Sequence, residues 1–240
     1  MVKWFSRKGY EFRAEDIMMR FFNLSSVYEI YVLVKLIRTS INAGFTFSES
    51  YKKDYGLRES RYYHNDAYNN AFVFQRNGVN LSIFYSPVIY NGFATRNDDI
   101  SLYRSSSLSY NNASDSNSVN RRGSYYVPDY VIKIDHDGQE KYIICDAKYK
   151  KLYNVRAYDI PALGYKYLLS ISPSKANASL VGLDIFYGKT EDHLDAESIY
   201  DSCGDVSTSP QYMYMLTPLS EGVPVKNQMR SLRTLIGNLL

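Results

Sequence analysis

Two short acidic motifs near the middle of the chain have the residue types and spacing of a metal site. Asp129 follows Pro128, and Asp146 and Lys148 come directly after four apolar or aromatic residues. Because side chains alternate along a strand, Asp146 and Lys148 are expected on one face and Ala147 on the other. Two carboxylates and the backbone carbonyl of Ala147 are hard oxygen ligands that suit Mg²⁺ or Mn²⁺. A neighbouring lysine can position or deprotonate a water, or stabilise charge on a phosphate, as metal-assisted phosphodiester hydrolysis requires.

The stretch 125–151 has the pattern of a β-hairpin that carries both motifs. Two runs rich in β-branched and aromatic residues flank a short polar turn at 135–138, and this pattern predicts paired strands. Asp129 begins the first run and Asp146 ends the second, so their carboxylates converge if the strands are bent or bulged. Either motif alone is commonly structural, as a strand start or a surface ion pair, and only their combination favours catalysis.

A helix is predicted over 26–42, ending near Gly44. Ser26 and Glu29 have the spacing of a capping box, and the following run is apolar on nearly every face, which predicts a deeply buried helix. Glu29 therefore has two interpretations. It caps the helix N-terminus, or it points into the same site as Asp129 and Asp146.

The remaining pattern predicts an α/β fold with a mixed central sheet and flanking helices. Asn77-Gly78 between alternating runs predicts a second hairpin, because both turn positions need positive φ. Asp159 is expected to cap a later helix, with Pro161 in its first turn. The predicted elements are a hairpin at 71–76 and 79–86, a helix at 158–170, strands at 180–187 and 211–217, and an amphipathic helix at 225–239.

Two segments have a different character from this core. Ser and Asn dominate 101–124, which predicts a long flexible loop inserted in the domain. The loop ends in Arg121 and Arg122, which are either solvated charges or phosphate contacts at the mouth of the site. Residues 1–24 form an entry segment, either packed on the domain or left from a larger protein, and 25–240 are expected to form one domain.

Composition limits the other chemistries. The chain has 240 residues, a net charge of +3 and 22% charged residues, which is compatible with a folded protein and a polyanionic partner. The histidines have no zinc-ligand spacing, and there is no G-x-S-x-G motif or P-loop. No signal peptide or membrane span is predicted, and a reduced thiol at Cys145 favours the cytoplasm. The histidines are His64, His136 and His193, and the second cysteine is Cys203.

The motif pair, Pro128-Asp129 followed by Asp146-Ala147-Lys148, resembles that of the PD-(D/E)xK nuclease superfamily. This superfamily contains restriction-endonuclease-like enzymes with a shared αβββαβ core, and the order of predicted elements agrees with it. Within the superfamily, residues 27–31, 128–134 and 145–150 look most like the McrC-type nuclease subunit of 5-methylcytosine-dependent restriction systems. The resemblance covers about 25–190.

The resemblance implies roles for individual residues. Asp129, Asp146 and the Ala147 carbonyl would hold Mg²⁺ or Mn²⁺, Lys148 would serve the water or the phosphate, and Glu29 would complete the acidic set, directly or through water. Many relatives carry Gln or Lys on the helix after the D-x-K strand, but 158–166 has no Gln. The residues expected to replace it, and to contact DNA together with Arg121, Arg122, Lys150 and Lys151, are Tyr165 and Lys166.

The function implied is a Mg²⁺-dependent DNA endonuclease of a restriction or defence system. Because the chain has no P-loop, a separate AAA+ NTPase or DNA-recognition subunit is the expected partner, and a homodimer is compatible with the sequence. The alternative is a catalytically inactive nuclease-fold module for nucleic-acid binding or complex assembly. A third interpretation is a nuclease specific for RNA or for nucleic-acid structure.

Overall fold

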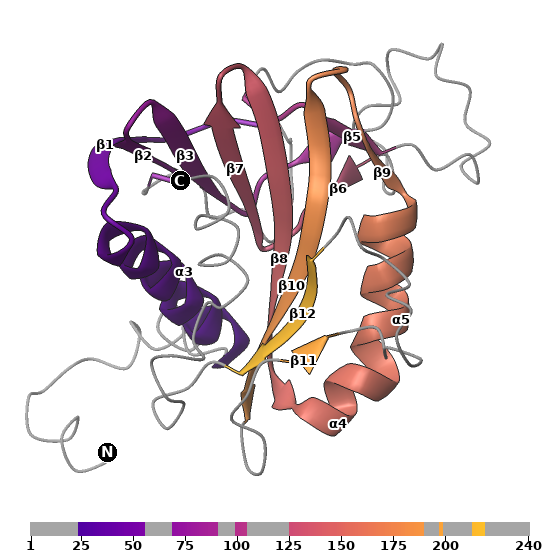
Figure 1. Ribbon diagram of the computed structural model, residues 1–240. Coiled ribbons are helices and arrows are strands. Elements are labelled where there is room, and N and C mark those ends of the chain that lie inside the picture. The colour runs from indigo at the N-terminus through magenta and orange to yellow at the C-terminus, as the bar shows by residue number, and fades with distance from the viewer. Residues whose placement is uncertain are drawn as a thin grey trace, which may run out of the picture.

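An eight-stranded sheet forms the centre of the protein, with the order β1-β2-β3-β7-β8-β10-β12-β11 (Figure 1). The computed structural model describes residues 24–55, 69–90, 99–104 and 125–189, with two further strands at 197–198 and 213–218. The strands of this sheet are β1 (Thr46–Tyr51), β2 (Ala71–Arg76), β3 (Val79–Tyr85), β7 (Tyr130–His136), β8 (Gln139–Lys151), β10 (Ala178–Lys189), β11 (Glu197–Ser198) and β12 (Met213–Pro218).

The sheet is mostly antiparallel, with a parallel part next to β8. Strands β1, β2, β3, β7 and β8 pair antiparallel in that order. Strand β10 then pairs parallel to β8, and β12 parallel to β10. Two small ribbons accompany the sheet, one of β4 (Ile89–Tyr90) with β6 (Tyr125–Tyr126), the other of β5 (Leu102–Arg104) with β9 (Ile171–Pro173). The expected mixed α/β character is confirmed at this level.

Helices cover both faces of the sheet. Figure 1 shows α3 (Leu24–Asn42) on one side, and α4 (Leu152–Asn154) and α5 (Ile160–Leu163) on the other. The second helical segment also contains two π-helical stretches, η3 (Val155–Asp159) and η4 (Gly164–Leu169). The strand period of two sends alternate side chains into separate cores. Ile143 and Cys145 pack under α3, whereas Tyr142 and Ile144 pack under the second segment.

The two predicted hairpins are confirmed. Strands β2 and β3 are joined at Asn77 and Gly78, with φ of 47° and 80°. Strands β7 and β8 are joined at Asp137 and Gly138, with φ of 50° and 73°. Positive φ at both turn residues suits the right-handed twist of the flanking strands, which explains why both hairpins are tight.

Helix α3 differs from its prediction in two respects. It includes Leu24, two residues before the predicted start, and no acidic residue lies in its first turn, so Glu29 is not a capping residue. The expectation of burial on all sides is also wrong, because one face of α3 exposes Val27, Ile30 and Val34. The opposite face supplies the buried residues of the helix.

The segment after β8 also differs from its prediction. Helix begins directly at Leu152, so Asp159 lies inside the helical segment and makes no capping hydrogen bond. Strand β1 occupies a stretch where no element was predicted, and β5 lies within the predicted loop at 101–124. The rest of that loop with Arg121 and Arg122, the segment 1–23 and the predicted helix at 225–239 lie outside the described residues. In the part of the chain that the structure describes, no helix is long and apolar enough to cross a membrane.

Candidate active site

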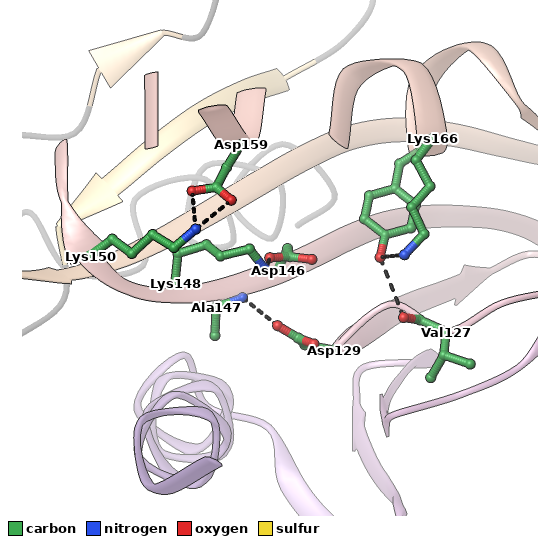
Figure 2. A network of polar contacts seen from close by, with 9 residues as sticks. Val127, Asp129, Asp146, Ala147, Lys148, Lys150, Asp159 and Lys166 are labelled. Atoms are coloured by element: carbon green, nitrogen blue, oxygen red, sulfur yellow. Dashed lines mark hydrogen bonds and ion pairs between the residues drawn. The ribbon is translucent and has the colours of Figure 1, made fainter. Parts of the chain in front are cut away.

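Asp129 meets strand β8 at the point where β7 begins. The β7–β8 ladder is regular up to its last pair, Tyr130 with Cys145. Beyond that pair, the Ala147 N–H donates a hydrogen bond of 2.7 Å to Oδ2 of Asp129 (Figure 2). The Asp129 carboxylate thus takes the position of the next backbone acceptor in the ladder. The two motifs converge through this side chain, without a bulge in the β7–β8 pairing.

Asp146 and Lys148 lie together on the face of β8 away from α3. Ala147 between them packs in the core under α3, as the alternation predicted. Nζ of Lys148 forms an ion pair with Oδ1 of Asp146 (Figure 2). Asp146 is only 3% exposed. A carboxylate so far from water needs a cation beside it to remain charged.

The charged groups of the site shift one another's pKa values. Burial raises the pKa of Asp129 well above its usual range, the charge of Asp146 raises it further, and Lys148 opposes both effects. Burial also raises the pKa of Asp146, again opposed by Lys148. Burial alone would lower the pKa of Lys148, but the charges of Asp146 and Asp129 raise it above its usual value. Lys148 is therefore the ammonium that does most to keep the two shielded carboxylates charged.

Glu29 lies at the α3 side of this site and is held by two tyrosines. The Tyr85 hydroxyl donates a hydrogen bond of 3.3 Å to Oε2 of Glu29. The Tyr130 hydroxyl donates to the Glu29 carbonyl, and the two tyrosine rings stack with their centroids 5.7 Å apart. Burial raises the pKa of Glu29, and the charges of Lys148 and Asp146 also act on it. Glu29 is thus close enough to Lys148 and Asp146 for their charges to act on it.

Lys166 reaches the site from the opposite layer. Its Nζ donates a hydrogen bond of 2.9 Å to the Tyr167 hydroxyl, which in turn donates one of 3.4 Å to the Val127 carbonyl. Burial lowers the pKa of Lys166, while the charges of Asp146 and Asp129 oppose this shift. Tyr165 is 45% exposed. Of the two residues expected to replace the Gln of the resembling family, the structure places Lys166 in the field of the carboxylates.

The predicted basic strip is partly neutralised. Nζ of Lys150 contacts both carboxylate oxygens of Asp159, at 2.8 and 2.9 Å (Figure 2). This ion pair links β8 to η3 and gives Asp159 a role that the sequence did not predict. Lys151 is exposed at the last residue of β8.

The residues that could hold a metal are limited to the two motif aspartates and backbone oxygen. Among the described residues, no three His, Cys, Asp or Glu side chains gather closely enough to bind a metal ion. Glu29 is therefore not placed as a third ligand beside Asp129 and Asp146. Because the N–H and carbonyl of a strand residue point to the same side, the Ala147 carbonyl also faces the side from which Asp129 approaches.

Sequence reasoning missed two of the tyrosines that surround the site, Tyr85 and Tyr167. Tyr85 is 56 positions from the glutamate that it contacts. Tyr167 is one of 25 tyrosines in the chain, and its position alone did not distinguish it from the others. The position of Tyr130 directly after Asp129 was the one local clue. Comparisons with protein-family models, with curated proteins and with solved structures gave no match for this chain.

Proposed function

We propose that this chain is a metal-dependent DNA endonuclease whose cutting site comprises Asp129, Asp146 and Lys148. The observation that carries the proposal is the 2.7 Å hydrogen bond from the Ala147 N–H to Asp129. It brings the carboxylate of the first motif against the strand that carries the carboxylate and ammonium of the second. Two acidic groups and one lysine at one end of a buried hairpin are what hydrolysis of a phosphodiester with a hard cation needs.

The arrangement of elements supports the same proposal. After α3 and the sheet-edge strands β1 and β2 come the antiparallel strands β3, β7 and β8, then the helical segment and β10, which is parallel to β8. This order and these directions are those of the αβββαβ core that the resemblance implies. We therefore assign the restriction-endonuclease-like core to these elements as part of the proposal.

The donor set fits Mg²⁺ or Mn²⁺ in kind. Mg²⁺ commonly binds one or two carboxylates and completes its shell with water and substrate phosphate, so a third acidic ligand is not required. When bound, the ion would polarise a phosphate oxygen and lower the pKa of a water. Asp129 and Asp146 would hold the ion, and Lys148, an ammonium paired with Asp146, would stabilise charge on the phosphate.

Nicking of a supercoiled plasmid tests the assignment. The wild-type chain should nick in Mg²⁺ or Mn²⁺ and not in EDTA. Asp146→Asn and Lys148→Gln should each lower the nicking rate by about 10²-fold or more. Asp137→Asn is the matched control, since Asp137 is 87% exposed at the far end of the same hairpin, and it should nick normally. Equal rates for all four proteins, or no metal-dependent nicking by the wild type, would refute the proposal.

One observation favours a second candidate, a nuclease-fold module that binds nucleic acid without cutting it. In the described residues, Asp146 is already paired with Lys148 and no three-ligand group is present. Calorimetric titration with Mg²⁺ separates the two candidates. Heat of binding that Asp129→Asn abolishes supports the nuclease, whereas DNA binding without Mg²⁺ affinity supports the module.

The biological setting is part of the proposal. The whole chain has no P-loop, so a nuclease of this type would rely on another subunit for nucleotide hydrolysis or for choosing the DNA sequence. We place it in a restriction or defence system on the strength of the McrC-type resemblance. Comparison of plasmid DNA with RNA of equal length as substrate tests the preference for DNA.

A further inference from the structure

Arg104 lies in the β5–β9 ribbon and shares an aromatic ring with Lys166. It is the last residue of β5, and the carbon of its guanidinium lies 4.4 Å from the ring centroid of Tyr126 in β6. Nζ of Lys166 lies over the same ring, 5.5 Å from its centroid. Arg104 and Lys166, which come from different elements, therefore lie over the same Tyr126 ring.

The guanidinium of Arg104 has hydrogen-bond donors without acceptors. Its Nε and Nη1 atoms are shielded from solvent, and no described residue accepts a hydrogen bond from either of them. The residue as a whole is only half-buried. A charged donor that is shielded and unpaired is costly to the fold, and such a group in a native protein calls for an explanation, such as a water, an ion or a functional role.

Tyr126 connects Arg104 to the catalytic residues. Its ring packs edge-on against Tyr167, with centroids 6.3 Å apart and an interplanar angle of 87°. Tyr167 bonds the carbonyl of Val127, close in the chain to Asp129. Lys166 is close enough to Asp146 and Asp129 for their charges to act on it, and it shares the Tyr126 ring with Arg104.

We infer that Arg104 and Lys166 form a phosphate-binding subsite next to the cutting site, which holds a neighbouring phosphate of the DNA strand. A planar guanidinium with two nitrogen donors that lack a described acceptor matches the oxygens of a phosphate. Because folding has already removed water from these groups, a phosphate there gains more than at an exposed lysine. The identity of the ligand as DNA rests on the proposed function, but the phosphate chemistry does not.

The test measures binding of a labelled duplex of about 20 base pairs in EDTA, over a series of salt concentrations. Arg104→Gln should weaken binding about tenfold and lower the slope of log K against log [salt] by about 0.9, as expected for one lost phosphate contact. Arg104→Lys keeps a cation on Tyr126 but loses the planar fork, and it should recover the slope more than the affinity. Arg38→Gln is the charge control, since Arg38 is exposed on α3, and it should change neither quantity.

The outcomes separate this inference from the proposed function, because binding in EDTA does not require cutting. A wild type that binds DNA without cutting it, with the predicted change of slope in Arg104→Gln, would retain the subsite and reject the nuclease. A slope for Arg104→Gln equal to that of the wild type, equal losses in Arg104→Gln and Arg38→Gln, or no duplex binding by the wild type would overturn the inference. Thermal melting establishes whether each variant is folded. If Arg104→Gln does not fold, the affinity and salt dependence of Arg104→Lys provide the test instead.

Discussion

At the scale of single residues, Glu29 shows how the tyrosines set the chemistry of a carboxylate. The Tyr85 hydroxyl bonds its side chain, whereas the Tyr130 hydroxyl bonds its backbone carbonyl. Both tyrosines are buried and their rings stack. The first contact controls where the carboxylate points, and the second fixes α3 against β7. The two hydroxyls therefore hold different parts of Glu29, one its carboxylate and the other its backbone carbonyl.

This difference in contacts predicts different results for two variants that each remove one hydroxyl. Tyr85→Phe frees the Glu29 side chain, so we expect the Mg²⁺ concentration for half-maximal nicking to rise by about fivefold, with little change in melting temperature. Tyr130→Phe removes a hydrogen bond between β7 and α3, which costs about 1 kcal/mol and lowers the melting temperature by about 2–4 °C. Nicking rates over a series of Mg²⁺ concentrations and thermal melting check both. Identical behaviour of the two variants would contradict this prediction.

The residues predicted correctly are those whose positions depend on local geometry. Asp146, Ala147 and Lys148 were placed on the right faces because the period of a strand is two. Asp159 was predicted as a helix cap and instead pairs with Lys150. That contact depends on how the helical segment packs on β8. Such pairings between elements are not encoded in any short stretch of sequence.

At the scale of elements, the close approach of α3 to the sheet depends on a glycine. A Cβ built on Gly188 of β10 would lie 2.7 Å from ring atoms of both Tyr28 in α3 and Tyr149 in β8. Those two rings are 5.6 Å apart between centroids. The absence of a side chain at this position lets the helix that carries Glu29 lie next to the strand that carries Lys148.

Two glycine-to-alanine changes test this packing. Gly188→Ala forces the rings apart and should destabilise the protein by about 1–3 kcal/mol, the usual cost of overpacking. Gly164→Ala is the control, because nothing lies within 4 Å of its added Cβ and its backbone is helical. It should be neutral or stabilise by up to about 1 kcal/mol. Urea unfolding measures both, and a stable Gly188→Ala protein would show that the approach does not depend on the glycine.

Element boundaries were predicted less well than element types, for an identifiable reason. Strand β8 passes into α4 at Lys151 and Leu152 without a turn residue or a side-chain cap. No start signal therefore precedes the helix. The predicted start fell instead at the first Asp and Pro that follow, Asp159 and Pro161. The π-helical turns of η3 and η4 likewise have no sequence pattern of their own, although such turns are frequent at functional sites.

At the scale of the whole molecule, a second polar cluster anchors the hairpin end opposite the cutting site. Glu140 is 6% exposed and accepts hydrogen bonds of 2.9 Å from Lys133 and 2.8 Å from the Tyr142 hydroxyl. Burial alone would raise the pKa of Glu140, but interaction with the Ser101 side chain and the hydrogen bonds from Lys133 and Tyr142 lower it to about 2. The folded state therefore favours the ionised carboxylate.

The lowered pKa of Glu140 predicts a pH dependence of stability. Its contribution is fully present above the unfolded value of about 4.3 and is lost as the pH falls towards about 2. Glu140→Gln should thus be less stable than the wild type at pH 7, by on the order of 2 kcal/mol, and this difference should shrink by pH 3. Urea unfolding at both pH values measures it, and a constant difference would contradict the assignment.

We propose that Asp129 and Asp146 act as one metal-binding unit in DNA cleavage. The most direct measurement is the Mg²⁺-dependent nicking rate of a plasmid by the wild type, Asp129→Asn, Asp146→Asn and the double variant. Residues that act as a unit have non-additive effects. We predict that each single change lowers the rate by about 10²-fold or more and that the double variant is no slower than the slower single variant. Single variants that nick at the wild-type rate, or two losses that multiply in the double variant, would contradict the account.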